Sequence, residues 1–403
     1  MGNTPNIRFK GFTNDWEQRK LGDICSRVQG NDGRMELPTL TISAANGWMK
    51  QEDRFSGNIA GKEQTNYTLL HKGELSYNHG NSKLAKYGTV FSLQTYEEAL
   101  VPRVYHSFKV ENESADFIEY YFATKIPDRE LRKLISSGAR MDGLLNIGYD
   151  DFMGIKMMFP SASEQDKIAE YFRALDHIIT LHQRKCDETK KLKKFMLQKM
   201  FPKKDAKKPE IRFAGFTDDW EQRKLGEVFQ EYSEKNHPEL PALTIIQGGG
   251  TVLREESERK LQYDKSSLAG YKMVREDDFI VHLRSFEGGL EKSNHNGLIS
   301  PAYHTFHGDE VDSRFYYPYF RSYEFIKHKL VPHVYGIRDG RSIDIDGMKT
   351  IEIPWTLYEE QKKIGDYIES LDTLITLHRR AYYNKKGGLT NVHNDNQQHY
   401  AIL

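Results

Sequence analysis

The chain carries the same sequence motif twice. Residues 7–22 read IRFKGFTNDWEQRKLG and residues 211–226 read IRFAGFTDDWEQRKLG, so only two of sixteen positions differ. A second matched pair closes each half, because residues 165–184 (QDKIAEYFRALDHIITLHQR) align with residues 361–380 (QKKIGDYIESLDTLITLHRR). Each copy spans roughly 200 residues, far more than the repeat of a solenoid protein. The sequence therefore predicts a duplicated domain, each copy followed by a connector.

The segments between these motifs, residues 25–160 and 229–354, match only loosely. Nearly identical ends around divergent middles favour a common mechanical role for the ends and two different recognition tasks for the middles. Ordinary drift after duplication is the alternative interpretation. The sequence thus separates a shared framework from two variable domains.

Both middle segments are expected to be mixed α/β. Helices are predicted near residues 115–136 and 312–330, where aromatic residues recur at three-to-four spacing and are expected in the core. Strands are predicted at runs rich in β-branched and aromatic residues. Residues 40–42 are taken as equivalent to 243–246 in the other half, and residues 88–91 as equivalent to 297–299.

The connector after Pro160 has the pattern of one long amphipathic helix. Ser163 is the predicted N-cap, and acidic Glu164 and Asp166 suit the positive end of the helix. Apolar residues follow at three-to-four spacing up to Pro202, which gives a helix roughly 55 Å long at 1.5 Å per residue. A matching stripe starts near the C-terminus, and the two stripes are expected to pack as an antiparallel coiled coil. The residues predicted in it are Ile168, Tyr171, Leu175, Ile179, Leu192, Ile364, Tyr367, Leu371 and Ile375.

The predicted fold class is α+β, with two globular α/β domains joined by long helices. The second helix is expected to be shortened, because Gly387 and Gly388 and an Asn/Gln/His-rich tail interrupt its apolar stripe. The predicted boundaries are a first domain at 1–160, a central helix with a basic linker at 161–203, a second domain at 204–355, a shortened helix at 356–385 and an atypical tail at 386–403.

Composition narrows the class of protein. Lys plus Arg and Asp plus Glu both number 58, so the net charge is zero, which argues against a nonspecific polycation on DNA. The two cysteines, Cys25 and Cys186, are too far apart in sequence for a CxxC pair, which argues against a disulfide framework or a cysteine zinc site and fits the cytoplasm. No run of about 18 apolar residues occurs, so no membrane segment is expected.

Signatures of enzymes are weak. The glycine run at residues 248–250 lacks a phosphate-loop motif and is better interpreted as a turn equivalent to residues 43–47. Asp344 and Asp346 with Glu360 and Lys362 loosely imitate a nuclease site, but the latter two lie where charges cap a helix. The sequence predicts no catalytic residue, no metal site and no cofactor in this chain.

Features of DNA-binding proteins are stronger. Residues 190–208 contain nine lysines, which indicate either a solvated linker or a face that contacts phosphates or a partner. In each middle segment, basic and polar residues gather in loops at corresponding places, and Arg, Asn, Lys and Ser are the residue types that contact bases and phosphates. The candidates are Asn78, Asn81, Ser82, Lys83, Lys86, Tyr87, Ser137, Arg140, Arg284, Ser285, Lys292, Tyr335, Arg338, Arg341 and Ser342.

With these motifs in view, the chain resembles the specificity subunit of a type I restriction-modification system. The resemblance rests on the doubled FxGFTxDWEQRKLG opening, at residues 9–22 and 213–226, and on the doubled closing motif at residues 160–184 and 354–380. It covers about residues 1–380.

The resemblance implies a non-catalytic subunit with two target recognition domains, each reading one half of a bipartite, asymmetric site in double-stranded DNA. It also implies partners: two modification subunits that use S-adenosylmethionine, and restriction subunits that use ATP and Mg²⁺. Two alternatives stay open, a free-standing nuclease or methyltransferase and a coiled-coil scaffold that binds only protein.

Overall fold

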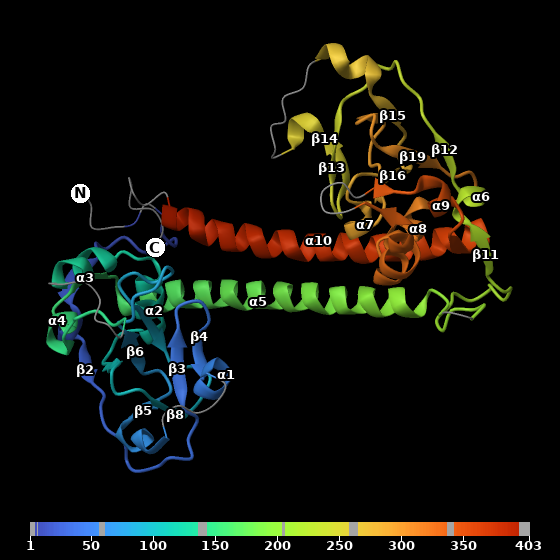
Figure 1. Cartoon of the computed structure of the whole chain (residues 1–403). Helices are drawn as coiled ribbons and strands as arrows, with labels where there is room; N and C mark the ends of the chain where they lie inside the picture. The colour runs from blue at the N-terminus through green and yellow to red at the C-terminus, as the bar shows by residue number, and fades with distance from the viewer. Residues whose placement is uncertain are drawn as a thin grey trace. The chain divides into compact units, whose positions relative to one another are not determined.

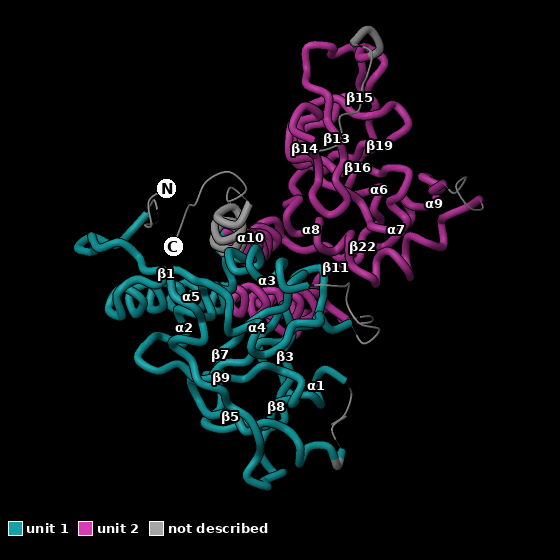
Figure 2. Tube along the Cα trace, turned by 90° about the vertical axis from the view of Figure 1, so that its left-hand side faces the viewer, with its two compact units in different colours: residues 1–182, 381–403 teal, residues 183–380 magenta. Residues whose placement is uncertain are grey.

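The computed structural model of the chain describes residues 5, 7–55, 61–135, 143–203, 206–257, 265–336 and 342–394. The chain forms two compact units (Figure 2). Unit 1 consists of residues 1–182 and 381–403, and unit 2 of residues 183–380. Both units mix helices and strands, and the long helix α5 (Ala162–Lys199) confirms the predicted α+β class.

Unit 1 is built on antiparallel strand pairs (Figure 1). Strand β1 (Glu17–Lys20), in the repeated opening motif, pairs with β10 (Lys156–Phe159), which immediately precedes α5. The central four-stranded sheet has the order β2 (Cys25–Arg27), β9 (His106–Val110), β6 (Leu75–Asn78), β7 (Thr89–Ser92). The remaining elements are the pairs β3 (Leu40–Ser43) with β4 (Gly47–Lys50) and β5 (Thr68–His71) with β8 (Glu98–Val101), and the helices α1 (Gln51–Phe55), α2 (Ala115–Ala123), α3 (Asp128–Leu134) and α4 (Tyr149–Met153).

Unit 2 repeats this plan (Figure 1). The opening strand β11 (Glu221–Lys224) pairs with β22 (Glu352–Trp355), which precedes helix α10 (Tyr358–Asn394). The four-stranded sheet has the order β12 (Gln230–Tyr232), β19 (His304–His307), β16 (Phe279–Val281), β17 (Glu291–Lys292). The other elements are the pairs β13 (Leu243–Ile246) with β14 (Gly250–Leu253), β15 (Lys272–Val274) with β18 (Gly297–Ile299) and β20 (Val334–Tyr335) with β21 (Ser342–Ile343), and the helices α6 (Leu225–Val228), α7 (Ser285–Gly288), α8 (Ser313–Phe320) and α9 (Ile345–Lys349).

One predicted equivalence between the halves is wrong. The strand at residues 297–299 corresponds to β8 rather than to residues 88–91, because Leu298 bridges Ala242 in the way that Leu100 of β8 bridges Thr39. The true counterpart of β7 is the two-residue strand β17. Its sequence, Glu291-Lys292, has no apolar pattern, so periodicity gave no sign of a strand there.

The aromatic residues of the predicted helices lie in the cores, as expected. Phe117 and Phe315 are fully buried, at equivalent places in α2 and α8. Both helical stretches are shorter than predicted. In unit 1, α2 ends before Lys125, whose φ of 64° is left-handed, and in unit 2 a π-helix, η5 (Glu324–Leu330), follows α8.

The long connector helix confirms the prediction, with one correction at its start. Helix α5 begins at Ala162, so Ser163 lies inside the first turn and is not the N-cap. Within unit 2, residues of α5 and α10 pack in opposite directions: Cys186 Sγ lies 3.8 Å from the carbonyl oxygen of Ile375, and Lys193 Nζ lies 2.6 Å from Asp372. This part of the helix pair has the predicted antiparallel arrangement.

The second helix is longer than predicted. Helix α10 continues past residue 385 to Asn394, so the expected interruption at Gly387 and Gly388 is wrong. Each glycine costs only about 1 kcal/mol relative to alanine in a helix, and the segment has no proline, which is the residue that blocks a helix sterically. None of the helices in the described ranges has the length and apolar character that crossing a membrane requires.

Candidate nucleic-acid interface

A buried ion pair joins the repeated opening motif to the repeated closing motif in each unit. Arg8 donates to both carboxylate oxygens of Glu164, at 2.6 Å each. Arg212 donates to those of Glu360 in the same way, at 2.6 and 2.8 Å. Both glutamates are fully buried. The framework is therefore fixed by a bidentate charged contact, which is the strong form of this interaction.

Sequence reasoning missed this contact because it assigned Glu164 and Glu360 to helix capping. The recurrence of Arg in one motif and Glu in the other, in both halves, is a signal that pointed to a pair. The next residue also takes part, since the side-chain oxygens of Gln165 and Gln361 accept hydrogen bonds from the backbone N–H of Ser114 and Asp312, each at 3.1 Å. These bonds fix the residues immediately before α2 and α8.

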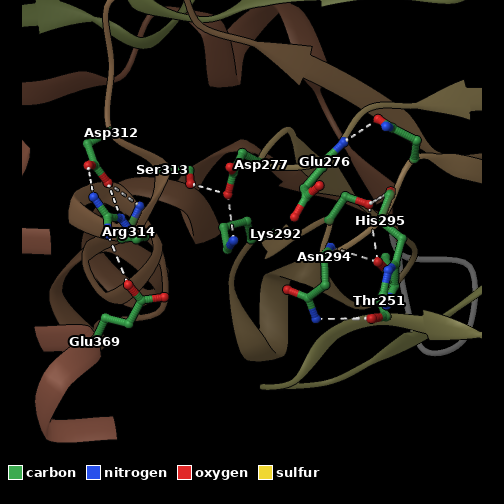
Figure 3. A network of polar contacts seen from close by, with 12 residues as sticks. Thr251, Glu276, Asp277, Lys292, Asn294, His295, Asp312, Ser313, Arg314 and Glu369 are labelled. Carbon is green, nitrogen blue, oxygen red and sulfur yellow. Dashed lines mark hydrogen bonds and ion pairs between the residues drawn. The ribbon is translucent and has the colours of Figure 1, made fainter. Parts of the chain in front are cut away.

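A second ion pair joins each middle segment to its connector helix, with its charges reversed between the units. In unit 1, Asp116 of α2 pairs with Arg173 of α5. In unit 2, Arg314 of α8 pairs with Glu369 of α10 at 2.9 Å (Figure 3). The position of Asp116 is that of Arg314, two residues after the backbone N–H that the glutamine holds.

The polar loop after β6 presents most of its candidate residues to solvent. Asn81, Ser82, Lys83 and Lys86 are exposed, and Tyr87 is partly buried. Asn78 differs, because its amide donates to the Ile42 carbonyl at 3.3 Å and its side-chain oxygen accepts the Gly80 N–H at 3.0 Å. It is engaged in shaping the loop.

The corresponding loop of unit 2 presents fewer of its candidates. Arg284 is exposed at the start of α7. Ser285 is fully buried, and its hydroxyl accepts the N–H of His282 at 2.9 Å. Lys292 pairs with Asp277 at 2.6 Å, and Asp277 also accepts a hydrogen bond from Ser313 (Figure 3). Arg284 is the member of this group whose side chain is exposed.

The last candidates lie around the β20–β21 hairpin. Tyr335 and Ser342 face each other across it, and both are exposed. The structure does not describe the hairpin's intervening residues 337–341. Ser137, Arg140, Arg338 and Arg341 lie outside the described residues.

The turns at residues 43–47 and 246–250 occupy equivalent places, as predicted, since each joins the two strands of one hairpin. Sequence reasoning treated the second turn only as framework and passed over Gln247, which is exposed at its tip.

The lysine-rich segment is less available to phosphates than its composition indicates. Lys199 and Lys203 both pair with Glu210, and hydrogen bonds from these two lysines lower the pKa of that carboxyl to about 2. Lys193 pairs with Asp372. Lys207 and Lys208 pair with Asp219, and Lys190 with Asp187. Among the described residues, Lys191 and Lys194 form no ion pair.

The residues predicted for the helix pair differ in burial. Ile168, Ile364 and Leu371 are buried; Leu175, Ile179, Tyr367 and Ile375 are partly buried; Tyr171 and Leu192 are exposed. In unit 2, Phe195 of α5 and Leu374 and Leu377 of α10 are also exposed, at 47%, 44% and 54%. Such a set of large apolar side chains at the surface is typical of a docking face.

The residues that imitate a nuclease site have structural roles. Asp344 caps α9 by accepting the N–H of Gly347 at 3.1 Å, and Glu360 pairs with Arg212. Within the described ranges, no three His, Cys, Asp or Glu side chains are grouped as metal ligands.

Comparison with known proteins finds similarity to one family of restriction-system subunits. The model of the type I restriction modification DNA specificity domain matches residues 13–191. The type I restriction enzyme MjaVIII specificity subunit of Methanocaldococcus jannaschii is 25% identical over 396 residues, covering 91% of this chain and 88% of that protein. The putative type I restriction enzyme MjaX specificity subunit of the same organism is 23% identical over 391 residues, covering 91% and 89%.

A solved structure has the same fold. The type I restriction-modification system S subunit from M. genitalium matches with a TM-score of 0.57 at 14% identity, covering 97% of this chain and 98% of that one. The chain spans 88% and 89% of the length of these two sequence relatives. The DNA specificity domain is therefore matched over residues 13–191, and across 91% of its length the chain is similar to specificity subunits of type I restriction enzymes.

Proposed function

We propose that this subunit reads a bipartite, asymmetric site in double-stranded DNA, with each unit reading one half. The observation that carries the proposal is the pairing of one framework with two different surfaces. Both units fix the opening and closing motifs by the same Arg–Glu pair and the same glutamine. The exposed polar loops that they hold at equivalent places differ in sequence, so two units of one shape would read two different half-sites.

The exposed residues would divide into those that contact bases and those that contact phosphates. In unit 2, Arg284 is exposed and would donate to guanine, whose O6 and N7 accept from a guanidinium. In unit 1, Asn81 is an exposed amide in the loop after β6, and the exposed Lys83 and Lys86 of the same loop would contact phosphates. Phosphate contacts position a protein on DNA while base contacts set its specificity, and both kinds are needed in each half.

The helices are the proposed docking sites for partner subunits. Leu192, Phe195, Leu374 and Leu377 of unit 2 expose apolar surface that a modification subunit would cover. Two modification subunits, one for each copy of the framework, would bring S-adenosylmethionine to the DNA. Restriction subunits would add ATP- and Mg²⁺-dependent translocation and cutting. The chain itself would contribute recognition and spacing.

Selection from random DNA tests the proposal. The chain, co-purified with its modification subunit, is incubated with a pool of random duplexes at a fixed salt concentration, because phosphate contacts make binding salt-dependent. We expect enrichment of two short conserved blocks separated by unread bases. A pool without any enriched sequence, or with a single continuous block, would contradict the proposal.

A further inference from the structure

The tip of the β13–β14 hairpin in unit 2 is exposed but rigidly held. Ile246, Gln247, Gly248 and Gly249 are all exposed, and the chain reverses through Gly248 and Gly250, whose φ values of 80° and 72° favour glycine. Glycine turns of this kind are usually adaptable. Here, contacts beneath the turn remove that freedom.

A buried carboxylate holds the amide side of the tip. Glu291 is fully buried and accepts the N–H of Gly248 at 2.8 Å and that of Gly250 at 3.2 Å. The hydroxyl of Tyr317 donates to the same carboxylate at 2.7 Å, and the Arg321 guanidinium pairs with it. The charge of Glu291 is thus compensated inside the protein and is used to fix two backbone groups.

A buttressing amide holds the carbonyl side. The Asn294 side chain donates to the carbonyl oxygen of Thr251 at 3.0 Å (Figure 3) and to that of Gly249 at 2.9 Å. The backbone N–H of Asn294 donates to the Thr251 hydroxyl at 2.9 Å. Donors and acceptors of the turn are therefore fixed from both sides.

The equivalent tip in unit 1 is supported differently. Glu291 corresponds to Phe91 by strand register. Glu291 precedes Lys292, which pairs with Phe279 at the start of β16, and Phe91 precedes Ser92, which pairs with Leu75 at the start of β6. A Cβ on Gly47 would lie 3.4 Å from the Phe91 ring, so an aromatic ring supports that turn by apolar contact. The polar clamp belongs to unit 2 and suits a function of that unit rather than of the shared framework.

Gln247 is the side chain that this clamp presents. Its amide forms no hydrogen bond with any residue in the described ranges, yet it lies close over α7. A Cβ on Gly288 would approach within 2.2 Å of Gln247 Nε2, and the three nearest atoms all belong to Gln247. Exposed Arg284 precedes the same helix.

We infer that Gln247 reads an adenine in the half-site bound by unit 2, and that Glu291 is its positioning residue. A glutamine amide matches adenine in the major groove, donating to N7 and accepting from the N6 amino group. A tip fixed in advance loses little freedom on binding, which favours discrimination between bases. This inference rests on the proposed function and deepens it.

The first test replaces each adenine of that half-site with 7-deazaadenine, which lacks the N7 acceptor. The half-site of unit 2 is identified as the block that changes when residues 229–354 are exchanged for those of another specificity subunit. With the wild-type complex, we expect one position to weaken binding by roughly 5- to 150-fold, the range of a good bidentate contact. Gln247→Ala is expected to remove the sensitivity at that position and leave every other position unchanged.

The second test separates positioning from general stability. Gly288→Ala displaces the Gln247 amide without touching the clamp, and Glu291→Gln weakens the clamp without touching Gln247. Both should reduce the 7-deazaadenine penalty at the same position, and Glu291→Gln combined with Gln247→Ala should be no worse than Gln247→Ala. Phe91→Leu is the matched control and should leave this half-site unaffected.

The outcomes distinguish the two claims. A wild-type complex without sequence preference would overturn the proposed function and this inference with it. A wild-type complex that reads a bipartite site, but tolerates 7-deazaadenine equally with and without Gln247, would overturn this inference alone. If Glu291→Gln weakens both half-sites to the same extent, Glu291 supports the fold and does not position a reader.

Discussion

The two units share one ion pair that anchors the opening motif, and they differ in a second ion pair whose charges are reversed between the units. Both anchor the opening motif through a buried Arg–Glu pair. Both then join the first turn of a middle-segment helix to the connector helix by an ion pair, but unit 1 places the acid on α2 and the base on α5, whereas unit 2 places the base on α8 and the acids on α10. The Arg–Glu pair is common to both units, and the polarity of the second ion pair is specific to each unit.

This difference indicates how a duplicated framework keeps its parts distinct. A recognition domain moved to the other connector would meet a like charge, Asp116 facing Glu369 or Arg314 facing Arg173. The same division explains the turns, one supported by Phe91 and the other by Glu291. Contacts between residues that are identical in the two copies define the shared fold, and contacts between residues that differ distinguish the two units.

The largest expected effect tests whether the shared anchor is equally strong in both units. Glu360→Ala removes the carboxylate that pairs with Arg212 and that accepts hydrogen bonds from Trp220 Nε1 and the Thr356 hydroxyl. Glu164 lacks the tryptophan bond, because the equivalent Trp16 indole forms no hydrogen bond among the described residues. Breaking a buried pair costs about 3–5 kcal/mol, and each orphaned buried group about 1–3 more. We expect Glu360→Ala to lower the free energy of unfolding more than Glu164→Ala.

Urea denaturation of both variants measures this difference. Glu359→Ala, at an exposed neighbouring position, is the control and should change the unfolding free energy little. Equal losses for Glu360→Ala and Glu164→Ala would show that the additional partners of Glu360 contribute nothing.

The second prediction concerns a pH dependence confined to unit 1. Burial, with a smaller contribution from Asp176, raises the pKa of Glu119 to about 7, although its carboxylate accepts the Ser92 N–H at 2.8 Å. The folded state therefore holds a proton that the unfolded state releases at lower pH, so stability falls as pH rises from about 4.5 to 7. Because the Glu119 side chain is only partly buried, we expect a loss on the order of 2 kcal/mol.

Glu119→Gln checks this sign, since it keeps the acceptor and removes the charge. The variant should match the wild type at pH 4.5 and be more stable at pH 8, as measured by chemical unfolding at each pH. The counterpart residue in unit 2 is Tyr317, and burial raises the pKa of its hydroxyl, so the equivalent position in unit 2 does not ionise in this range. A constant difference between Glu119→Gln and wild type across the range would argue against the raised pKa.

The third prediction tests the reversed ion pairs. Asp116→Arg sets two arginines against each other in unit 1, and Arg314→Asp places a fourth acid beside Asp312, Asp366 and Glu369 in unit 2. The replaced side chains are partly exposed, so each change should cost only about 0.5–1 kcal/mol. Adding Arg173→Asp to Asp116→Arg should restore most of the loss, and a double-mutant cycle measures the recovery. Additive losses would show that the two residues do not interact.

The smallest expected effect comes from the helix pair of unit 2. In unit 1, Tyr120 donates to Asp176 at 2.9 Å, but Pro318 stands at the equivalent place in unit 2 and the corresponding Asp372 pairs with Lys193 instead. Lys193→Ala should cost about 0.2–1 kcal/mol in thermal unfolding, as exposed ion pairs do. Lys194→Ala, its unpaired neighbour, should be neutral, and an equal effect of both would deny a role to the Lys193–Asp372 pair.

The sequence was sufficient to predict the duplication, the long helix and the burial of Phe117 and Phe315, because repeated motifs and helical periodicity are local properties. It was insufficient for contacts between distant segments. Glu164 has the pattern of a capping residue, and only the folded chain brings Arg8 to it. The two-residue strand β17 is fixed by its neighbours in the sheet and has no pattern of its own.

The candidate site was predictable as loops but not as residues. Arg284 and Ser285 are neighbouring polar residues in the sequence, yet the first is exposed and the second is fully buried. Gln247 was missed because a glycine-rich turn resembles plain framework until Glu291 is seen beneath it. Which polar side chain faces outward depends on packing that spacing does not determine.

The most direct test of the central claim is a methylome. DNA from cells that express this chain with a cognate modification subunit is sequenced at single-molecule level, together with DNA from cells in which residues 25–160 are exchanged for those of another specificity subunit. The account predicts methyladenine in a bipartite motif, with one half changed by the exchange and the other half retained. A motif that changes in both halves, or in neither, would contradict the assignment of one half-site to each unit.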